Sequence, residues 1–249
     1  MPMPAPPLRV VITRGRTRNN RLHLPGHFLA GVEAEYAGTR LGRQELDGEL
    51  IEDIEGALWT RAMLEACRAP ELLPGEAAER CTRIVVGVDP PAGTGGDACG
   101  IIVAGLGHDG RGHVLGDSSV TGARPGQWAR VVREEYGRWR ADRIVAEANQ
   151  GGEMVREVLE QAGAVRLPVR LVHASRGKSA RAEPVAALYE RGAVAHCGRF
   201  TALEDEMAGL TIGGAYEGPG RSSDRADALV WALTELMLGR RGEPRVLGL

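Results

Sequence analysis

Short apolar segments recur at regular spacing after Cys81, and their order constrains the fold more than any other feature of the sequence. The first three segments predict strands, and the last two of these are joined by HDGRG, whose Asp-Gly pair is typical of a hairpin turn. A helix that begins near Pro125 follows them. The predicted strands cover 83–89, 99–105 and 113–118, and the helix covers 125–139.

From there to residue 238, predicted strands and helices alternate. The strands cover 143–146, 169–173 and a short stretch near Val194, and the helices cover 152–162, 180–191, 201–208 and 224–238. Three hairpin-linked strands, a helix and then this alternation predict an α/β fold with a mixed sheet flanked by helices. An all-parallel sheet would require a helical crossover between each pair of strands.

Composition limits the classes of protein to which the chain can belong. Its 249 residues include 43% hydrophobic ones, enough for a large globular core, and the net charge of −2 gives no general attraction to nucleic acid. No apolar run approaches a membrane span and no signal peptide is visible, so we expect a soluble protein in the cytoplasm. Four cysteines without a CxxC pair predict reduced thiols and no zinc knuckle.

Acidic residues stand where strands end and where the last helix begins. Asp89 ends the first strand of this region, Glu147 ends the fourth, and Asp224 and Asp227 open the final helix, three residues apart. If the first and fourth strands are neighbours, Asp89 and Glu147 lie side by side and the last helix can bring its aspartates to them. Carboxylates at close range repel, and hard divalent cations such as Mg²⁺ or Mn²⁺ relieve this repulsion.

Each acid also has an ordinary structural explanation. Asp89 precedes two prolines and can form a turn, and Glu147 can be a solvated residue at the sheet edge. Asp224 is an adequate helix N-cap, and Asp227 suits the dipole of the first helical turn. The four acids together, in this order of elements, favour a metal site for two ions that hydrolyses a phosphodiester.

The segments RIVVGVDPP, RIVAEANQGG, KSARAEPVAALYERG and SSDRADALVWALTEL occur in that order, and together they resemble the nuclease domain of the large terminase subunits of tailed phages. These subunits are the DNA-packaging motors of phages, prophages and gene transfer agents. The resemblance covers about residues 81–238 and implies an RNase H-like fold. It also implies a metal-dependent endonuclease that cleaves concatemeric double-stranded viral DNA.

The resemblance assigns roles to the acids by position. Asp89 and Glu147 match two metal ligands of the family. The family often has an Asp-Asp pair where this chain has Ser223-Asp224, so Asp224 is the first choice for the third ligand. Asp227 is the alternative, or an additional acid beside it.

Three further residues are candidates around the acids. Lys178 and Arg181 match a basic pair of the family, which implies contact with DNA phosphates. Asp97, in the loop after the first strand, is a candidate for orienting a metal-bound water. Trp231 falls on an apolar helical face and is predicted to be a core residue.

The division of the chain also follows the resemblance. Residues 1–80 resemble the end of the terminase ATPase domain and include a helix at 58–67 and a linker at 70–79; 81–240 form the nuclease domain, and 241–249 a tail. No GxxxxGK[ST] loop is present, so we expect no ATPase activity. We therefore expect a fragment of a longer motor, or a gene split from its ATPase half.

The resemblance implies partners and leaves alternatives. The implied partners are double-stranded DNA, a portal protein and a small terminase subunit in the host-cell cytoplasm, with oligomers only inside the assembled motor. One alternative is a structure-selective resolvase or an RNase H on the same fold. The other is a non-catalytic docking module of the packaging motor.

Overall fold

The computed structural model describes residues 17–36, 53–91, 98–149, 152–175 and 177–239. The chain divides into two compact units, 1–52 and 53–249. In the first unit, the short helix η1 (Thr17–Asn20) precedes helix α1 (Gly26–Tyr36). All other described elements belong to the second unit.

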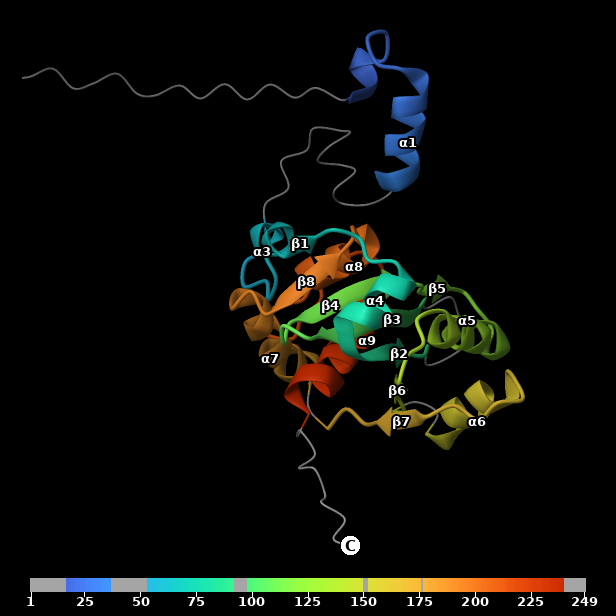
Figure 1. The fold of residues 1–249 in the computed structure, drawn as a ribbon. Coiled ribbons are helices and arrows are strands. Elements are labelled where there is room, and N and C mark those ends of the chain that lie inside the picture. Colours follow the sequence, from blue (N-terminus) through green and yellow to red (C-terminus); the bar gives the residue numbers. More distant parts are fainter. Residues whose placement is uncertain (1–16, 37–52, 92–97, 150–151, 176, 240–249) are drawn as a thin grey trace, which may run out of the picture. The chain divides into compact units, whose positions relative to one another are not determined.

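A mixed sheet forms the centre of the second unit, as the sequence predicts (Figure 1). Its order is β1-β8-β4-β3-β2-β6-β7, with β5 paired to β3. Strand β3 is antiparallel to both of its neighbours, β2 and β4, whereas β6 and β7 continue the sheet parallel to β2. The strands are β1 (Arg68–Ala69), β2 (Cys81–Asp89), β3 (Ala98–Gly107), β4 (Gly112–Asp117), β5 (Val120–Thr121), β6 (Arg143–Glu147), β7 (Val169–Val172) and β8 (Val194–Cys197).

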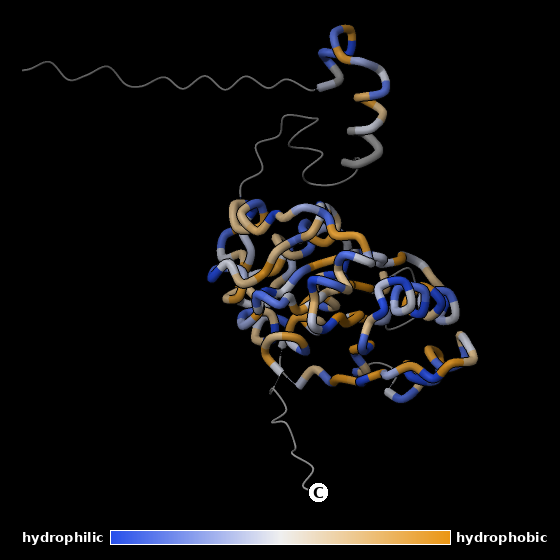
Figure 2. The backbone as a smooth tube through the Cα atoms, viewed as in Figure 1, coloured by the Kyte–Doolittle hydropathy of each residue, from blue (hydrophilic) through white to orange (hydrophobic). Residues whose placement is uncertain are grey.

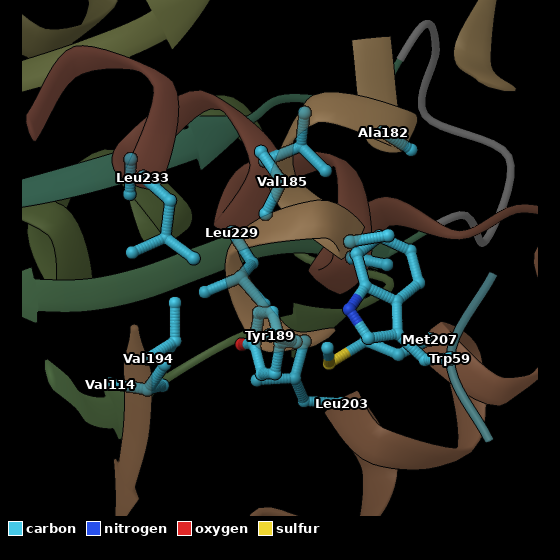
Figure 3. Close-up of a cluster of buried hydrophobic side chains, with 14 of the residues drawn as sticks. Trp59, Val114, Ala182, Val185, Tyr189, Val194, Leu203, Met207, Leu229 and Leu233 are labelled. Carbon is cyan, nitrogen blue, oxygen red and sulfur yellow. The ribbon is translucent and has the colours of Figure 1, made fainter. Parts of the chain in front are cut away.

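Helices cover both faces of the sheet, and hydrophobic residues follow the central strands while α5 carries mainly hydrophilic ones (Figure 2). One core cluster includes residues of α7, α8 and α9, and the other includes residues of α4, α5 and α6. Figure 3 shows part of the first cluster, with Tyr189 of α7 and Leu229 of α9. The helices are α3 (Arg61–Ala66), α4 (Pro74–Arg80), α5 (Pro125–Arg138), α6 (Glu153–Gln161), α7 (Lys178–Glu190), α8 (Thr201–Ala208), α9 (Asp224–Leu233) and the π-helical η2 (Thr234–Leu238).

Two sequence expectations need correction. The expected linker at 70–79 contains helix α4, because Pro74 opens the helix and Leu72 and Ala77 are buried in the second core cluster. The last helix, expected to be uniform over 224–238, changes to π-helical geometry at Thr234.

The segment before β2 packs with the sheet. Trp59 is fully buried, and Leu64 of α3 lies in the same core cluster as α7 and α9. The boundary at residue 80 stays a prediction, and residues from Asp53 onward belong to the second compact unit. All four cysteines are free and buried.

None of the helices in the described residues is long and apolar enough to cross a membrane.

A buried ion-pair cluster around Glu204 joins α8 to the far edge of the sheet. Glu204 Oε2 accepts a hydrogen bond from the Arg68 guanidinium at 2.6 Å, and Oε1 lies 3.0 Å from His196 Nδ1. Burial opposes ionisation, but the hydrogen bonds from His196 and Arg68 outweigh it and lower the pKa of Glu204 to about 2. The carboxylate is therefore charged across the neutral range.

This lowered pKa predicts a pH dependence of stability. A carboxyl whose pKa is depressed on folding stabilises the protein above its unfolded pKa, and that contribution disappears as pH falls from about 4.5 to about 2. At neutral pH we expect Glu204→Gln to lower the free energy of unfolding by about 3 kcal/mol. Urea unfolding between pH 7 and pH 2 measures this difference, which should shrink with acidification.

The control Glu65→Gln removes a largely exposed partner of the same Arg68 and should have little effect. A difference that stays constant down to pH 2 would contradict the assignment.

Candidate metal centre

The parallel pairing of β2 and β6 brings two of the predicted acids together. The last registered pair is Val88 with Ala146, and the next residue on each strand is Asp89 and Glu147. Their side chains point to one face of the sheet, since residues two apart on a strand share a face and Gly87 lies under α9 on that face. The condition set in the sequence analysis, that the first and fourth strands of this region are neighbours, is therefore met.

The start of α9 lies directly over the end of the sheet where Asp89 is located. Gly100, which pairs with Asp89 across β2 and β3, has no side chain, and a Cβ at this position would lie 2.0 Å from the Asp224 carbonyl oxygen. Close approach of the helix backbone therefore depends on this glycine. Asp227 is buried, and Asp224 Oδ1 accepts a hydrogen bond from Ser222 Oγ at 2.7 Å.

Both basic residues singled out in the sequence contact the acids. Lys178 Nζ donates to Asp227 Oδ2 at 2.6 Å and to Ser223 Oγ at 3.2 Å. The Arg181 guanidinium donates to Glu147 Oε2 at 3.0 Å and to Asp227 Oδ1 at 3.3 Å. One guanidinium therefore joins carboxylates of β6 and α9, and the contact of these two cations with phosphate stays a prediction.

Glu147 is held by further neighbours. Trp231 Nε1 donates to Glu147 Oε2 at 2.7 Å, and the Arg181 guanidinium lies 4.9 Å from the centre of the indole ring. Asn149 Nδ2 donates to Glu147 Oε1 at 2.7 Å, and Asn149 Oδ1 accepts from the Ala174 backbone. Both carboxylate oxygens are thus oriented by hydrogen bonds.

Sequence reasoning missed the contact that Trp231 makes. The residue is buried, as predicted, but its indole N–H faces the acids. The spacing could have indicated this contact, because Trp231 follows Asp227 by four residues and therefore lies on the same face of the helix.

The acids interact strongly through space. Burial raises the pKa of Asp89 well above its usual range, and the nearby charges of Asp227, Glu147 and Asp224 raise it further. Burial also opposes charging Lys178, but attraction to Asp227, Asp89 and Asp224 outweighs burial and raises the pKa of the amine. Four carboxylates against two cations leave a formal charge of −2, which a divalent ion can offset.

The donor chemistry suits Mg²⁺ or Mn²⁺, since all four acids offer hard oxygen ligands. Within the described residues, no three acidic, histidine or cysteine side chains converge closely enough to ligate an ion as they stand. The contacts of Asp227 explain part of this, because Lys178 and Arg181 already engage its two oxygens. Asp97 lies outside the described residues.

The indole contact predicts a loss of metal affinity when it is removed. Trp231→Phe keeps an aromatic ring but removes the hydrogen bond to Glu147, so we expect Mn²⁺ affinity to fall about 10-fold or more. Titration of Mn²⁺ followed by electron paramagnetic resonance measures this change. Trp139→Phe is the matched control, because it removes an equally short 2.7 Å indole hydrogen bond to Glu135, a residue of α5. Equal Mn²⁺ affinities in the two variants would contradict a positioning role for Trp231.

Comparison with known proteins places this arrangement in a family. The model of the terminase RNaseH-like domain matches residues 86–236, which include Asp89, Glu147, Asp224 and Asp227. A search of curated protein sequences finds no match.

Solved structures show the same fold. The large terminase nuclease of thermophilic phage G20c aligns with a TM-score of 0.54 at 16% identity, covering 72% of this chain and 98% of that one. Its magnesium-bound form aligns with a TM-score of 0.55 at 16% identity over 73% and 98% of the two chains. The large terminase of bacteriophage HK97 aligns with a TM-score of 0.54 at 15% identity, covering 72% of this chain but 43% of that longer one. By its match to the family model over residues 86–236, this chain belongs to the terminase RNaseH-like domain family.

Proposed function

We propose that the chain is a Mg²⁺- or Mn²⁺-dependent endonuclease that cleaves double-stranded DNA by two-metal-ion hydrolysis. The observation that carries the proposal is that β2, β6 and the start of α9 place four carboxylates in one region, where the charges of Asp227, Glu147 and Asp224 raise the pKa of Asp89. Family membership supports a nuclease. The structures of the G20c nuclease with bound magnesium, cobalt or zinc support a divalent ion in the proposed site.

The proposed ligands are Asp89, Glu147 and Asp224, with Asp227 as the alternative third ligand or an additional acid. When bound, two divalent ions supply an activated water and stabilise charge on the phosphate and the leaving oxygen. Asn149 and Trp231 orient Glu147 for this task, and Ser223 Oγ, 2.9 Å from Asp227 Oδ2, orients Asp227.

Lys178 and Arg181 have two successive roles in this proposal. Without metal they neutralise Asp227 and Glu147 from distances of 2.6 to 3.3 Å. If Asp227 and Glu147 held metal ions instead, Lys178 and Arg181 would be available to contact the DNA phosphates. Lys178, whose side chain is 40% exposed, is better placed for this than Arg181, at 11%.

The biological setting belongs to the same proposal. We infer that the substrate is concatemeric viral DNA in the host cytoplasm and that a portal protein and a small terminase subunit are partners within the motor. Membership of the terminase family supports this inference. The chain covers 43% of the HK97 large terminase, and we expect no ATPase activity from this chain alone.

A substrate panel tests the proposal against its rivals. Linear duplex, a four-way junction and an RNA–DNA hybrid are incubated with the protein and Mn²⁺, and bound Mn²⁺ is counted in parallel. We expect cleavage of the duplex with little sequence preference, since phosphate contacts position DNA without specifying bases. Preference for the junction would indicate a resolvase, and preference for the hybrid an RNase H. A folded protein that neither binds Mn²⁺ nor cleaves any substrate would contradict the proposal and favour a docking module.

A further inference from the structure

Three arginines converge on one buried carboxylate away from the candidate metal centre. Glu235 of η2 accepts hydrogen bonds from Arg83 at 2.5 Å and Arg143 at 2.9 Å, and it also pairs with Arg170. The Glu235 side chain is 4% exposed, whereas the three arginine side chains are 34%, 41% and 54% exposed. We call Arg83, Arg143 and Arg170 the arginine row. Their guanidinium groups are partly exposed to solvent, whereas the carboxylate that they share is buried.

The sheet register explains why these side chains meet. Arg143 of β6 pairs with Val85 of β2, two residues from Arg83, and Arg170 of β7 pairs with Val145 of β6. Strands β2, β6 and β7 are neighbours in the sheet (Figure 1). By strand alternation, side chains at these positions share one face. The first turn beyond α9 brings Glu235 to the same face.

The arginine row starts at the end of β2 opposite to Asp89 and runs diagonally across β6 and β7 toward the register position of Glu147. Arg83 precedes Asp89 by six residues on β2, which corresponds to about 20 Å along an extended strand. The side chains of both residues point to the face that α9 covers. On duplex DNA a separation of about 20 Å is about six base pairs, given a rise of 3.4 Å per phosphate along each strand.

The charge balance of the row is unusual within the described part of the chain. Elsewhere one arginine pairs with two carboxylates. Arg68 contacts Glu65 and Glu204, and Arg225 contacts Asp117 and Glu206. At Glu235 the ratio is reversed, with three guanidiniums for one carboxylate and a formal excess of +2. Like charges this close repel one another, and an external anion relieves the repulsion.

Glu235 organises the row without neutralising it. Burial opposes its ionisation, but the hydrogen bond from Arg83 and the charges of Arg170 and Arg143 outweigh burial and lower the pKa of the carboxyl. The charged carboxylate fixes the guanidiniums side by side, and each guanidinium carries five N–H donors. Donors beyond those used on Glu235 remain for a ligand on the exposed side.

We propose that Arg83, Arg143 and Arg170 form a second DNA contact that binds backbone phosphates of a duplex, at distances along the strands from about 7 Å for Arg170 to about 20 Å for Arg83 from the acids of the metal centre. The inference rests on the proposed function for its choice of duplex DNA as the ligand. Guanidinium forks match phosphate oxygens in pairs. In the metal-free protein Lys178 and Arg181 engage acids, so the row supplies cations for DNA binding that does not depend on metal.

The test measures DNA affinity without catalysis. Binding of a labelled linear duplex to the full chain is followed by fluorescence anisotropy in EDTA over a series of KCl concentrations. For Arg143→Ala/Arg170→Ala we expect the slope of log K against log salt to decrease in magnitude by about 2, since each lost phosphate contact removes about 0.9. The control Arg138→Ala/Arg166→Ala removes two other exposed arginines, 60% and 83% exposed, and should keep the wild-type slope.

A second variant is expected to bind DNA more tightly, a result that misfolding would not produce. Glu235→Gln leaves three guanidiniums without their carboxylate, so a folded protein should bind duplex more tightly than wild type at the same salt concentration. Arg170→Ala alone removes the most exposed member and should reduce the slope by about 1. Thermal melting establishes that each variant is folded.

Several outcomes would overturn the inference. One is a wild-type slope in the arginine variants, and another is an equal decrease in the control. Weaker binding to poly-glutamate with unchanged binding to DNA would also overturn it and indicate an acidic protein partner. Plasmid cleavage at low salt separates the two proposals: normal cleavage with an unchanged slope removes only the second contact. A decreased slope in a protein that never cleaves DNA removes only the nuclease.

Discussion

Replacing Asp89 by asparagine is expected to abolish metal-dependent DNA cleavage, with a rate loss of about 10³-fold or more. The half-buried carboxylate ends β2 beside Glu147, and the charges of Asp227, Glu147 and Asp224 act on it. A lost metal ligand removes several kcal/mol of charge stabilisation, and each 1.36 kcal/mol corresponds to tenfold in rate. Single-turnover cleavage of linear duplex in Mn²⁺ measures the loss.

The fold should survive this substitution. Asparagine has the size of aspartate but removes a charge that burial and the neighbouring acids make unfavourable, so the metal-free variant should melt at a higher temperature than wild type. Asp109→Asn is the control, because Asp109 is 53% exposed on the turn between β3 and β4. Cleavage by Asp89→Asn within a few-fold of wild type would remove Asp89 from the site. A lower melting temperature in EDTA would contradict the electrostatic account.

Replacing Gly100 by alanine should have the second largest effect. The new Cβ would lie 2.0 Å from the Asp224 carbonyl oxygen, 2.5 Å from its carbon and 3.0 Å from Ala228 Cβ. Backbone atoms of α9 cannot rotate away, so the helix must move off the sheet and carry Asp224 and Asp227 away from Asp89. We expect a loss of about 2 kcal/mol in unfolding free energy from overpacking. We also expect cleavage to fall about 10²-fold, because shifts near 1 Å have effects of that size.

Gly137→Ala separates this steric effect from a general effect of glycine replacement. Gly137 lies in α5, and nothing lies within 4 Å of a Cβ placed there. Alanine favours helix more than glycine does, so this variant should be as stable as wild type or more so, with unchanged cleavage. Urea unfolding and single-turnover cleavage of both variants provide the comparison. Normal cleavage by Gly100→Ala would show that the position of α9 is not important for the site.

The strand pattern predicted the parts of the site that depend on strand ends. Asp89 and Glu147 come together because two parallel strands end in register. The sequence placed each acid at the end of a strand, but the pairing of these two strands entered only as a condition. Asp224 and Asp227 were placed at the start of the last helix for similar reasons. The mixed sheet followed from three hairpin-linked strands before the first helix.

The rest of the site depends on the rotation and depth of packed helices, which sequence periodicity does not determine. Whether Lys178 and Arg181 face solvent or the acids is decided by how α7 lies against α9. The indole N–H of Trp231 is directed by the same packing. Gly100 appeared only as part of a strand, because a close approach between a strand and a distant helix leaves no local pattern.

The arginine row also escaped prediction. Arg83 and Arg143 each stand at the start of a predicted strand, where a single exposed cation is ordinary. Their meeting with Arg170 and Glu235 requires the order of β2, β6 and β7 in the sheet together with the end of the last helix. Contacts across three strands and a helix become visible only in three dimensions.

The most direct test of the central claim is the incubation of the purified chain with supercoiled plasmid in Mn²⁺, in Mg²⁺ and in EDTA. The acids of β2, β6 and α9 predict nicked and then linear plasmid with either metal and intact plasmid in EDTA. Intact plasmid under all three conditions, with protein that circular dichroism shows to be folded, would contradict the claim that this chain is a metal-dependent endonuclease.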